Sequence, residues 1–266
     1  MKIYISTDIE GVTGIAHWDE TEKTKEDYRY FAEQMTREVE AACKGATNAG
    51  ADEIWIKDAH ETGRNLDPSK LTENIRLIRG WSGHPFSMVQ GLDESFDALM
   101  YIGYHSGGGT NFNPLAHTMN SSTIDYIKLN GENCSEFLLH SYIAAYLGVP
   151  VAFLSGDKGL CSEAHKLNEN IVTVAVNEGI GNSTVSIHPD VAISRIKEGV
   201  EKALRKDLDK CKIKLPSSFE IEIKYSTHAM AYRHSFYPNV KQIGPKTIIL
   251  NSEDYFEILR GVLFLT

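Results

Sequence analysis

Strand-length apolar segments alternate with helical repeats along most of this chain, and this alternation limits the fold more than any other feature. Apolar runs occur in "KIYIST", "DEIWIKDAH", "FDALMYIGYHS", "VAFLSG" and "IVTVAV". Helical spacing of apolar residues extends from about Lys25 to Asn48, and further helices are predicted after the capping residue Ser135 and after Pro189. The pattern predicts an α/β fold with a mainly parallel sheet flanked by helices.

The domain organisation follows from length and from one polar segment. The 266 residues, 42% of them hydrophobic, fit one large α/β domain with a smaller appendage. The lysine-rich stretch "KDLDKCKIKLPSS" is typical of a connector. We therefore expect an α/β core over residues 1–210 that carries the functional site. Residues 211–266 are expected to form a smaller carboxyl-terminal α/β subdomain packed as part of one unit.

Charge and cysteine content limit the partners and the compartment. The net charge is −9, from 27 basic and 36 acidic residues, so neither a nucleic acid nor an anionic membrane is expected as a partner. The longest apolar runs have strand length, and the chain enters its first strand without a signal-peptide pattern. The four cysteines are widely spaced and form no CxxC pair, which favours free thiols. These features predict a cytoplasmic protein.

The first strand ends in "TDIEG", where Asp8 and Glu10 project from the same side of the chain. Two carboxylates held this close repel each other unless a positive charge lies between them. A solvated strand end is the alternative interpretation.

Other ligand-type residues follow the other predicted strands. His60 comes after the second strand and His105 after the "FDALMYIGY" strand, while Glu136 lies in the first turn of the helix capped by Ser135. Carboxyl ends of parallel strands meet at one edge of a sheet, where ligands bind. Three carboxylates and two imidazoles suit zinc, or less often manganese or cobalt. A bridging carboxylate would create a two-metal site, with ions roughly 3.5–4 Å apart, that activates water for hydrolysis.

Three further features are open to two interpretations each. Asp58 either orients His60 from behind or caps the following loop. His117, at the end of the glycine-rich segment "SGGGTNFNPLAH", either transfers a proton or is a loop histidine bonded to the backbone. The glycines at 107–109 either present backbone N–H groups to an oxyanion or form a flexible segment. The sequence contains no GxGxxG, P-loop, GxSxG or HExxH motif, so nucleotide-dependent mechanisms have no support.

These motifs together resemble the D-aminopeptidase family of zinc metallopeptidases. The family signature, Ser-x-Asp-x-Glu-Gly, matches "STDIEG" from Ser6 to Gly11. The resemblance continues through "DAH", "PFSMVQGLD", "GYH", "AHTM" and the "SE" at Ser135, and so covers roughly the first 160 of the 266 residues. The carboxyl-terminal third matches in its order of strands and helices.

The resemblance implies two zinc ions per subunit, bridged by Asp8. The other ligands would be Glu10, His60, His105 and Glu136. The family's catalytic position falls on His117, as nucleophile or as proton shuttle.

The implied activity is release of N-terminal D-amino acids, D-alanine especially, from short peptides. The implied assembly is a homo-oligomer, a homodecameric ring. The loop between His105 and His117 departs from the family pattern, so the substrate preference need not carry over. Two alternatives are another di-metal hydrolase, an amidohydrolase or phosphoesterase, and a catalytically silent ring-forming protein.

Overall fold

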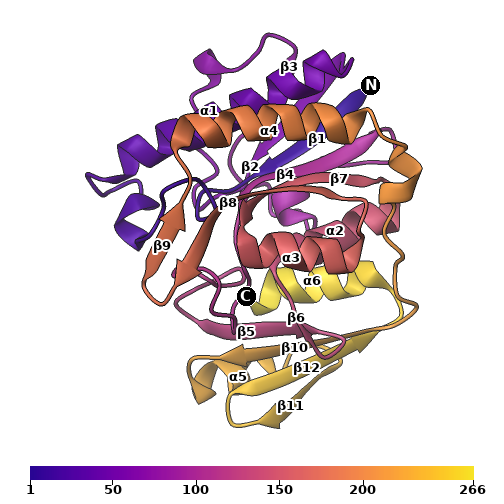
Figure 1. Cartoon of the computed structure of the whole chain (residues 1–266). Coiled ribbons are helices and arrows are strands. Elements are labelled where there is room, and N and C mark those ends of the chain that lie inside the picture. Colours follow the sequence, from indigo (N-terminus) through magenta and orange to yellow (C-terminus); the bar gives the residue numbers. More distant parts are fainter.

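The computed structural model describes residues 1–266 and contains two sheets, one above the other in Figure 1. The first sheet has seven strands in the order β3-β2-β1-β4-β7-β8-β9. Their bounds are β1 Lys2–Thr7, β2 Glu53–Asp58, β3 Ile75–Ile78, β4 Ala98–Tyr104, β7 Val151–Asp157, β8 Val172–Ile180 and β9 Ser183–Ser186. All neighbours pair in parallel except β8 and β9. The prediction of a mainly parallel sheet in an α/β fold is confirmed.

Helices cover both faces of this sheet. The helices α1 (Tyr28–Asn48) and α4 (Pro189–Leu204) lie side by side on one face, and α2 (Glu136–Leu147) and α3 (Lys158–Leu167) lie on the other (Figure 1). Ser135 caps α2 through its hydroxyl, and Pro189 is the first residue of α4, both as the sequence predicts. Four short 3₁₀ helices complete this part: η1 Trp18–Glu20, η2 Pro68–Lys70, η3 Ser87–Val89 and η4 Leu208–Cys211.

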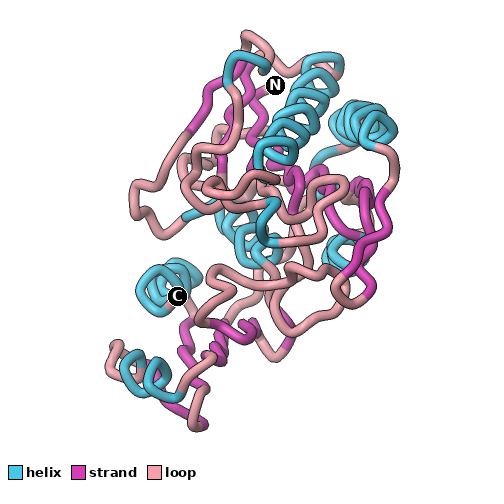
Figure 2. Tube along the Cα trace, turned by 90° about the vertical axis from the view of Figure 1, so that its left-hand side faces the viewer, coloured by secondary structure: helices cyan, strands magenta, loops and turns pink.

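The second sheet is antiparallel, with the order β11-β12-β10-β5-β6. Its strands are β5 Ile124–Leu129, β6 Glu132–Asn133, β10 Phe219–Tyr225, β11 Val240–Gly244 and β12 Thr247–Ser252, accompanied by helices α5 His228–His234 and α6 Tyr255–Leu265. Thus the carboxyl-terminal strands share their sheet with the hairpin β5–β6. In Figure 2 the N-terminus lies in the larger upper part and the C-terminus in the lower part. The division at residue 211 stays a prediction.

Two apolar cores hold these layers together. A cluster of 29 buried residues lies between the first sheet and α1 and α4, and includes Ile5 and Val39. A cluster of 39 buried residues lies between the two sheets and joins Tyr104 of β4 and Phe137 of α2 to Ile223 of β10. Because the second core draws on both sheets, neither sheet buries its inner face alone.

Some local boundaries differ from expectation. Helix α1 begins at Tyr28 rather than near Lys25. The closing helix α6, which the sequence predicts from Ser252, begins at Tyr255, where the Asp254 carboxylate accepts the N–H of Phe256. The edge strands β9 and β11 were not predicted. All four cysteines are free and buried, which confirms the expectation of free thiols. None of the helices has the length and apolar character needed to cross a bilayer.

Candidate metal centre

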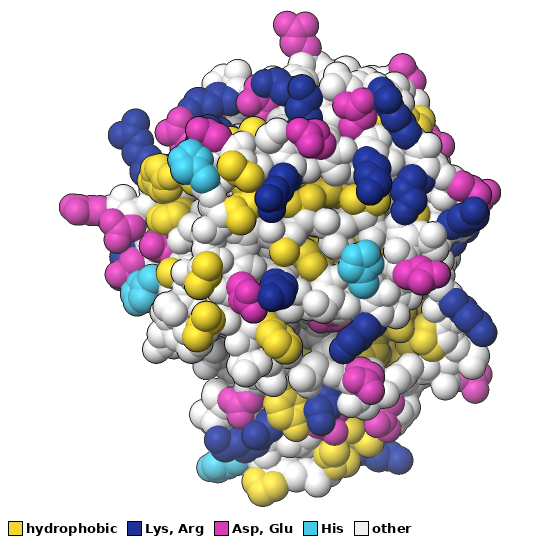
Figure 3. Space-filling model, viewed as in Figure 1, with side chains coloured by type: hydrophobic (Ala, Val, Ile, Leu, Met, Phe, Trp, Pro, Cys, Tyr) yellow, Lys and Arg dark blue, Asp and Glu magenta, His cyan; other side chains and the backbone are white.

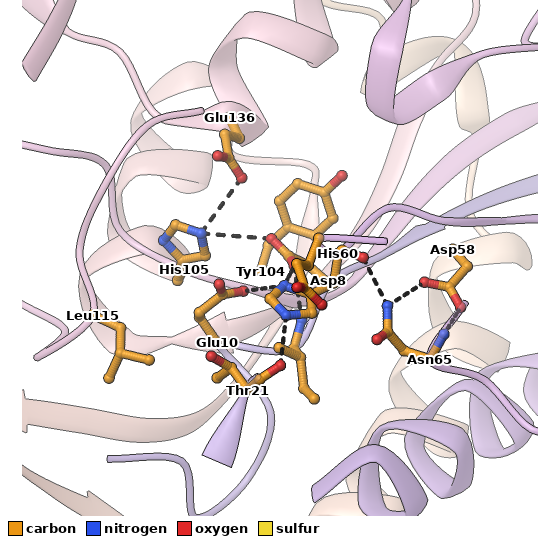
Figure 4. Close-up of polar contacts among 12 residues, drawn as sticks. Asp8, Glu10, Thr21, Asp58, His60, Asn65, Tyr104, His105, Leu115 and Glu136 are labelled. Carbon is orange, nitrogen blue, oxygen red and sulfur yellow. Dashed lines mark hydrogen bonds and ion pairs between the residues drawn. The ribbon is translucent and has the colours of Figure 1, made fainter. Parts of the chain in front are cut away.

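The five predicted ligands converge at one edge of the first sheet because their strands are neighbours. Strand β1 pairs with β2 on one side and β4 on the other, so the segments after these strands lie together. Two glycines allow this close packing: a Cβ on Gly11 would lie 1.8 Å from the carbonyl oxygen of Tyr104, and Gly103 adopts a φ of 71°. The first turn of α2 brings Glu136 to the same place (Figure 4).

Asp8, Glu10 and His60 form one group of three candidate ligands. The Nδ1 atom of His60 lies 3.2 Å from Asp8 Oδ1 and 3.2 Å from Glu10 Oε2. On the opposite side of the ring, Nε2 donates to the carbonyl oxygen of Thr21 at 2.9 Å. This contact directs Nδ1 toward the two carboxylates, as an outer partner does for a metal-binding histidine.

Asp8, His105 and Glu136 form a second group. The Nε2 atom of His105 lies 3.5 Å from Asp8 Oδ2 and 3.4 Å from Glu136 Oε2 (Figure 4). Its Nδ1 donates to the carbonyl oxygen of Ser106 at 3.0 Å. Asp8 therefore contributes one oxygen to each group, which is the arrangement a bridging carboxylate requires.

The centre contains buried polar atoms that have no hydrogen-bond partner. These atoms are Glu10 Oε2, His105 Nε2 and Glu136 Oε2, and all three point into the centre. Buried polar groups are nearly always paired, so three orphans in one place indicate a missing partner. Oxygen and imidazole nitrogen donors within 4.8 Å of one another suit zinc. The residues present fit a metal centre.

The electrostatics of the centre are those of a dense ion cluster. Burial by itself raises the pKa of the Asp8 carboxyl, but the adjacent imidazoles of His105 and His60 hold it well below its usual range. Burial also raises the pKa of the Glu136 carboxyl, but the nearby His105 and His117 lower it to about 2. The pKa values of His60 and His105 rise well above the ordinary value, since the facing carboxylates outweigh desolvation. Without metal, the facing carboxylates thus favour the protonated form of both imidazoles.

His117 lies at the edge of this centre. Its ring stacks on the His105 ring, with centroids 4.4 Å apart, and contacts the Trp18 ring edge-on. Its Nδ1 donates to the carbonyl oxygen of Leu115 at 2.9 Å, and its Nε2 lies 3.8 Å from Glu136 Oε1. His117 therefore makes the backbone contact of a loop histidine and also lies at the edge of the centre, so that contact does not exclude the predicted proton transfer. In the neutral ring Nε2 is left as a proton acceptor.

Asp58 does not touch the His60 ring. Its carboxylate accepts the backbone and side-chain N–H groups of Asn65 and the N–H of Leu66. Asn65 in turn donates to the carbonyl oxygen of His60 at 2.7 Å (Figure 4). Asp58 thus fixes the loop that carries His60 and acts on the backbone, whereas Thr21 orients the ring.

In the glycine-rich loop, the amide of Gly108 is bonded within the loop region and not at the metal centre. Gly108 donates its N–H to Thr118 Oγ1 at 3.1 Å. A Cβ on Gly107 would meet Ser135 Cα at 2.8 Å, and a Cβ on Gly108 would meet the carbonyl of Asp125 at 3.0 Å. Gly107 and Gly108 thus permit close packing of this loop against β5 and the start of α2.

A cavity of about 520 Å³ opens onto the centre. Beside the candidate ligands, its walls include Trp18, Trp81, Met88 and Leu263, and no lysine or arginine lines it. Sequence reasoning missed most of these wall residues, because the packing of distant segments such as η1 and α6 brings them together. A histidine behind the centre was also missed: His140 Nδ1 donates to the carbonyl oxygen of Glu136 at 2.7 Å. Its i, i+4 spacing from Glu136 was the available signal.

An α/β protein with a buried carboxylate–histidine centre at the carboxyl ends of its strands has the features of a metallohydrolase. Comparison with known proteins identifies the family. A family model described as D-aminopeptidase matches residues 1–264, and the chain belongs to this family.

A curated relative and a solved structure agree with this assignment. A D-aminopeptidase of Bacillus subtilis (strain 168) is 30% identical over 269 residues, covering 100% of this chain and 97% of the relative. The solved structure is that of a "Zn-dependent D-aminopeptidase DppA from Bacillus subtilis, a self-compartmentalizing protease". It superposes with a TM-score of 0.91 at 28% identity, over 100% of this chain and 96% of that one.

Proposed function

We propose that the protein is a zinc-dependent aminopeptidase that releases N-terminal D-amino acids, D-alanine especially, from short peptides. The observation that carries the proposal is Asp8, whose two oxygens face two separate groups of ligand-type side chains. Asp8, Glu10 and His60 would hold one zinc ion, and Asp8, His105 and Glu136 the other. When bound, two zinc ions supply polarisation of a carbonyl group and activation of water.

His117 is the proposed proton-transfer residue. The contact with Leu115 keeps the Nδ1 proton in place, so Nε2 is the atom that accepts and returns a proton at the centre. The stack on His105 and the edge contact with Trp18 hold the ring in that orientation. Transfer of the proton to the leaving amine completes cleavage of the peptide bond.

The charge of the cavity favours substrates with a free amino terminus. Besides the candidate ligands, Glu22 and Glu61 line the cavity, and neither forms an ion pair. With two zinc ions neutralising the inner carboxylates, these outer carboxylates would attract the ammonium group of a peptide. A phosphoester substrate is disfavoured, because no lysine or arginine lines the cavity.

The proposal is tested with Asp8→Ala. Elemental analysis of this variant should show that both zinc ions are lost, and release of alanine from D-Ala-D-Ala should fall below detection. Asp209→Ala, which removes an exposed carboxylate paired with Lys212, is the matched control and should keep both. Full activity of Asp8→Ala without metal would contradict the mechanism, and cleavage of L-Ala-L-Ala alone would contradict the specificity.

We also propose that the protein assembles as a homo-oligomer, as a homodecameric ring. Support comes from the self-compartmentalizing relative and from large exposed side chains on the carboxyl-terminal layer, Tyr232, Phe236, Ile243 and Phe264. Light scattering coupled to size-exclusion chromatography should give a mass of ten chains. A cytoplasmic location stays a prediction.

A further inference from the structure

A second cavity, of about 700 Å³, lies behind the metal centre. It is an open cavity lined by residues of α3, α2, the β5–β6 hairpin, β8 and the loop that follows His105. Figure 3 shows this face of the molecule, where hydrophobic, basic and acidic side chains lie close together over α3 and the strands below it. Its volume is within the range of small-molecule sites.

The charged groups of this cavity are unevenly paired. Lys158 and Glu178 form an ion pair at 3.1 Å. Glu163 of α3 has no cationic partner within ion-pair distance, and accepts one hydrogen bond, from Ser135 Oγ at 2.5 Å. Burial raises the pKa of the Glu163 carboxyl to about 7. An ammonium group placed beside it would stabilise its charged form. Lys166, one turn further along α3, also lines the cavity and forms no ion pair.

The remaining wall is mixed: polar side chains, among them Thr110, Asn130 and Glu132, alternate with an apolar part. The apolar part includes Phe112, Leu138 and Tyr142. The side chain of Phe112 packs directly on α3, since a Cβ on Gly159 would lie 2.3 Å from Phe112 Cβ. Any larger residue at position 159 would therefore displace the Phe112 side chain from α3.

This cavity and the metal centre share two segments of chain. Ser135 donates to Glu163 and also caps α2, whose first residue is Glu136. On the other segment, Ser106 follows His105 and lines the second cavity. Its N–H and hydroxyl both donate to the Asp157 carboxylate at 2.6 Å. A molecule that contacts Glu163 thus lies one hydrogen bond from the cap that positions Glu136.

We propose that the second cavity binds a small zwitterion, a free amino acid or a dipeptide, and that occupancy alters the metal centre through Ser135. The ammonium group pairs with Glu163, the carboxylate pairs with Lys166, and an apolar side chain packs on Phe112 and Tyr142. Binding as such does not depend on the proposed function. If the proposed function holds, the bound amino acid is the product of the reaction. Only this identification rests on the proposed function.

Calorimetric titration with D-alanine and with D-phenylalanine tests the proposal. The zinc-loaded wild-type protein should bind at the second cavity, and Asp8→Ala, which lacks the metal centre, should keep this binding. Glu163→Gln should lose at least about tenfold in affinity, because the charge-assisted contact is removed. Glu198→Gln, at an exposed carboxylate of α4 that contacts Ser194, is the matched control and should bind as wild type. Melting curves establish that each variant is folded.

Ser162→Trp provides an independent test, because an indole at this exposed position of the cavity wall fills the space. Binding at the second cavity should disappear in this variant. Inhibition of peptide cleavage by D-alanine, which should be mixed in the wild type, should become competitive. Binding that is lost in Asp8→Ala but intact in Glu163→Gln and Ser162→Trp would overturn the proposal, as would no binding at all. Absence of peptide cleavage by the wild type would refute the proposed function only.

Discussion

Protonation of two histidines links metal binding to pH. In the metal-free protein the pKa values of His60 and His105 lie well above the ordinary value, because the facing carboxylates favour the charged rings. Zinc binds neutral imidazole, so loading must expel these protons. The same raised pKa values stabilise the metal-free fold below pH ~6.5, and this stabilisation is lost as the pH rises through the folded pKa values.

We therefore expect zinc binding at pH 7 to release about two protons per chain and to tighten as the pH increases. Titration of zinc into metal-free protein in two buffers of different ionisation enthalpy measures the release. If the observed heat were independent of the buffer, the two rings would already be neutral, and the account of the centre would be wrong.

His117 should affect catalysis without affecting metal content. Replacement by alanine should lower kcat by about 10²–10⁴-fold, the usual contribution of a positioned acid–base group. Zinc content should stay near the wild-type level: His117 belongs to a third candidate group, with Glu10 and His105, but to neither of the two groups that share Asp8. His84→Ala changes another histidine of the same cavity and should cost little activity. Loss of zinc from His117→Ala would instead make His117 a ligand.

At the scale of elements, the cap of α2 should affect both the stability of the fold and the affinity for zinc. Ser135 accepts the N–H of Leu138 at 3.1 Å, so Ser135→Ala should lower the free energy of unfolding by about 1–2 kcal/mol. Because Glu136 is the first residue of this helix, zinc affinity should fall as well. Thr227→Ala removes the cap of α5, away from the metal centre, and should reduce stability alone. Equal zinc affinity in both variants would contradict the link.

Elements with a buried apolar face could be predicted from sequence, and exposed ones could not. Strands β1, β2 and β4 bury nearly all their residues, and their polar ends pointed to Asp8, His60 and His105. Strand β11, by contrast, has mostly exposed residues, and β9 likewise pairs at a sheet edge without an apolar repeat. A strand with no buried face has no alternation of apolar and polar residues, so its sequence does not indicate a strand.

The site shows the same division. Its candidate ligands follow local rules of strand period and capping, so they could be predicted from the sequence. The Thr21 carbonyl that orients His60, the Trp18 ring beside His117 and Leu263 in the cavity wall come from segments far apart in sequence. Only tertiary packing brings them together, and this packing cannot be predicted from the local pattern of a single sequence.

At the scale of the whole molecule, the two sheets should unfold together. The core between them contains residues of both, and Tyr255 of α6 donates its buried hydroxyl to the carbonyl oxygen of Leu139 in α2 at 2.6 Å. All three tryptophans lie in the first 81 residues, so their fluorescence reports on the first sheet. Far-UV circular dichroism reports on every element. In metal-free protein at fixed concentration, both signals should give one coincident urea transition.

Tyr255→Phe tests whether the two sheets unfold together. Loss of the hydroxyl removes one buried hydrogen bond, while the Leu139 carbonyl keeps its bond within the helix, so the change should cost about 0.5–1.5 kcal/mol. Because the contact lies between the layers, the midpoints of both signals should fall by the same amount. Tyr146→Phe, at an exposed tyrosine of α2, is the matched control and should leave both midpoints unchanged. If circular dichroism shifted while tryptophan fluorescence did not, the carboxyl-terminal layer would unfold independently, as a separate domain does.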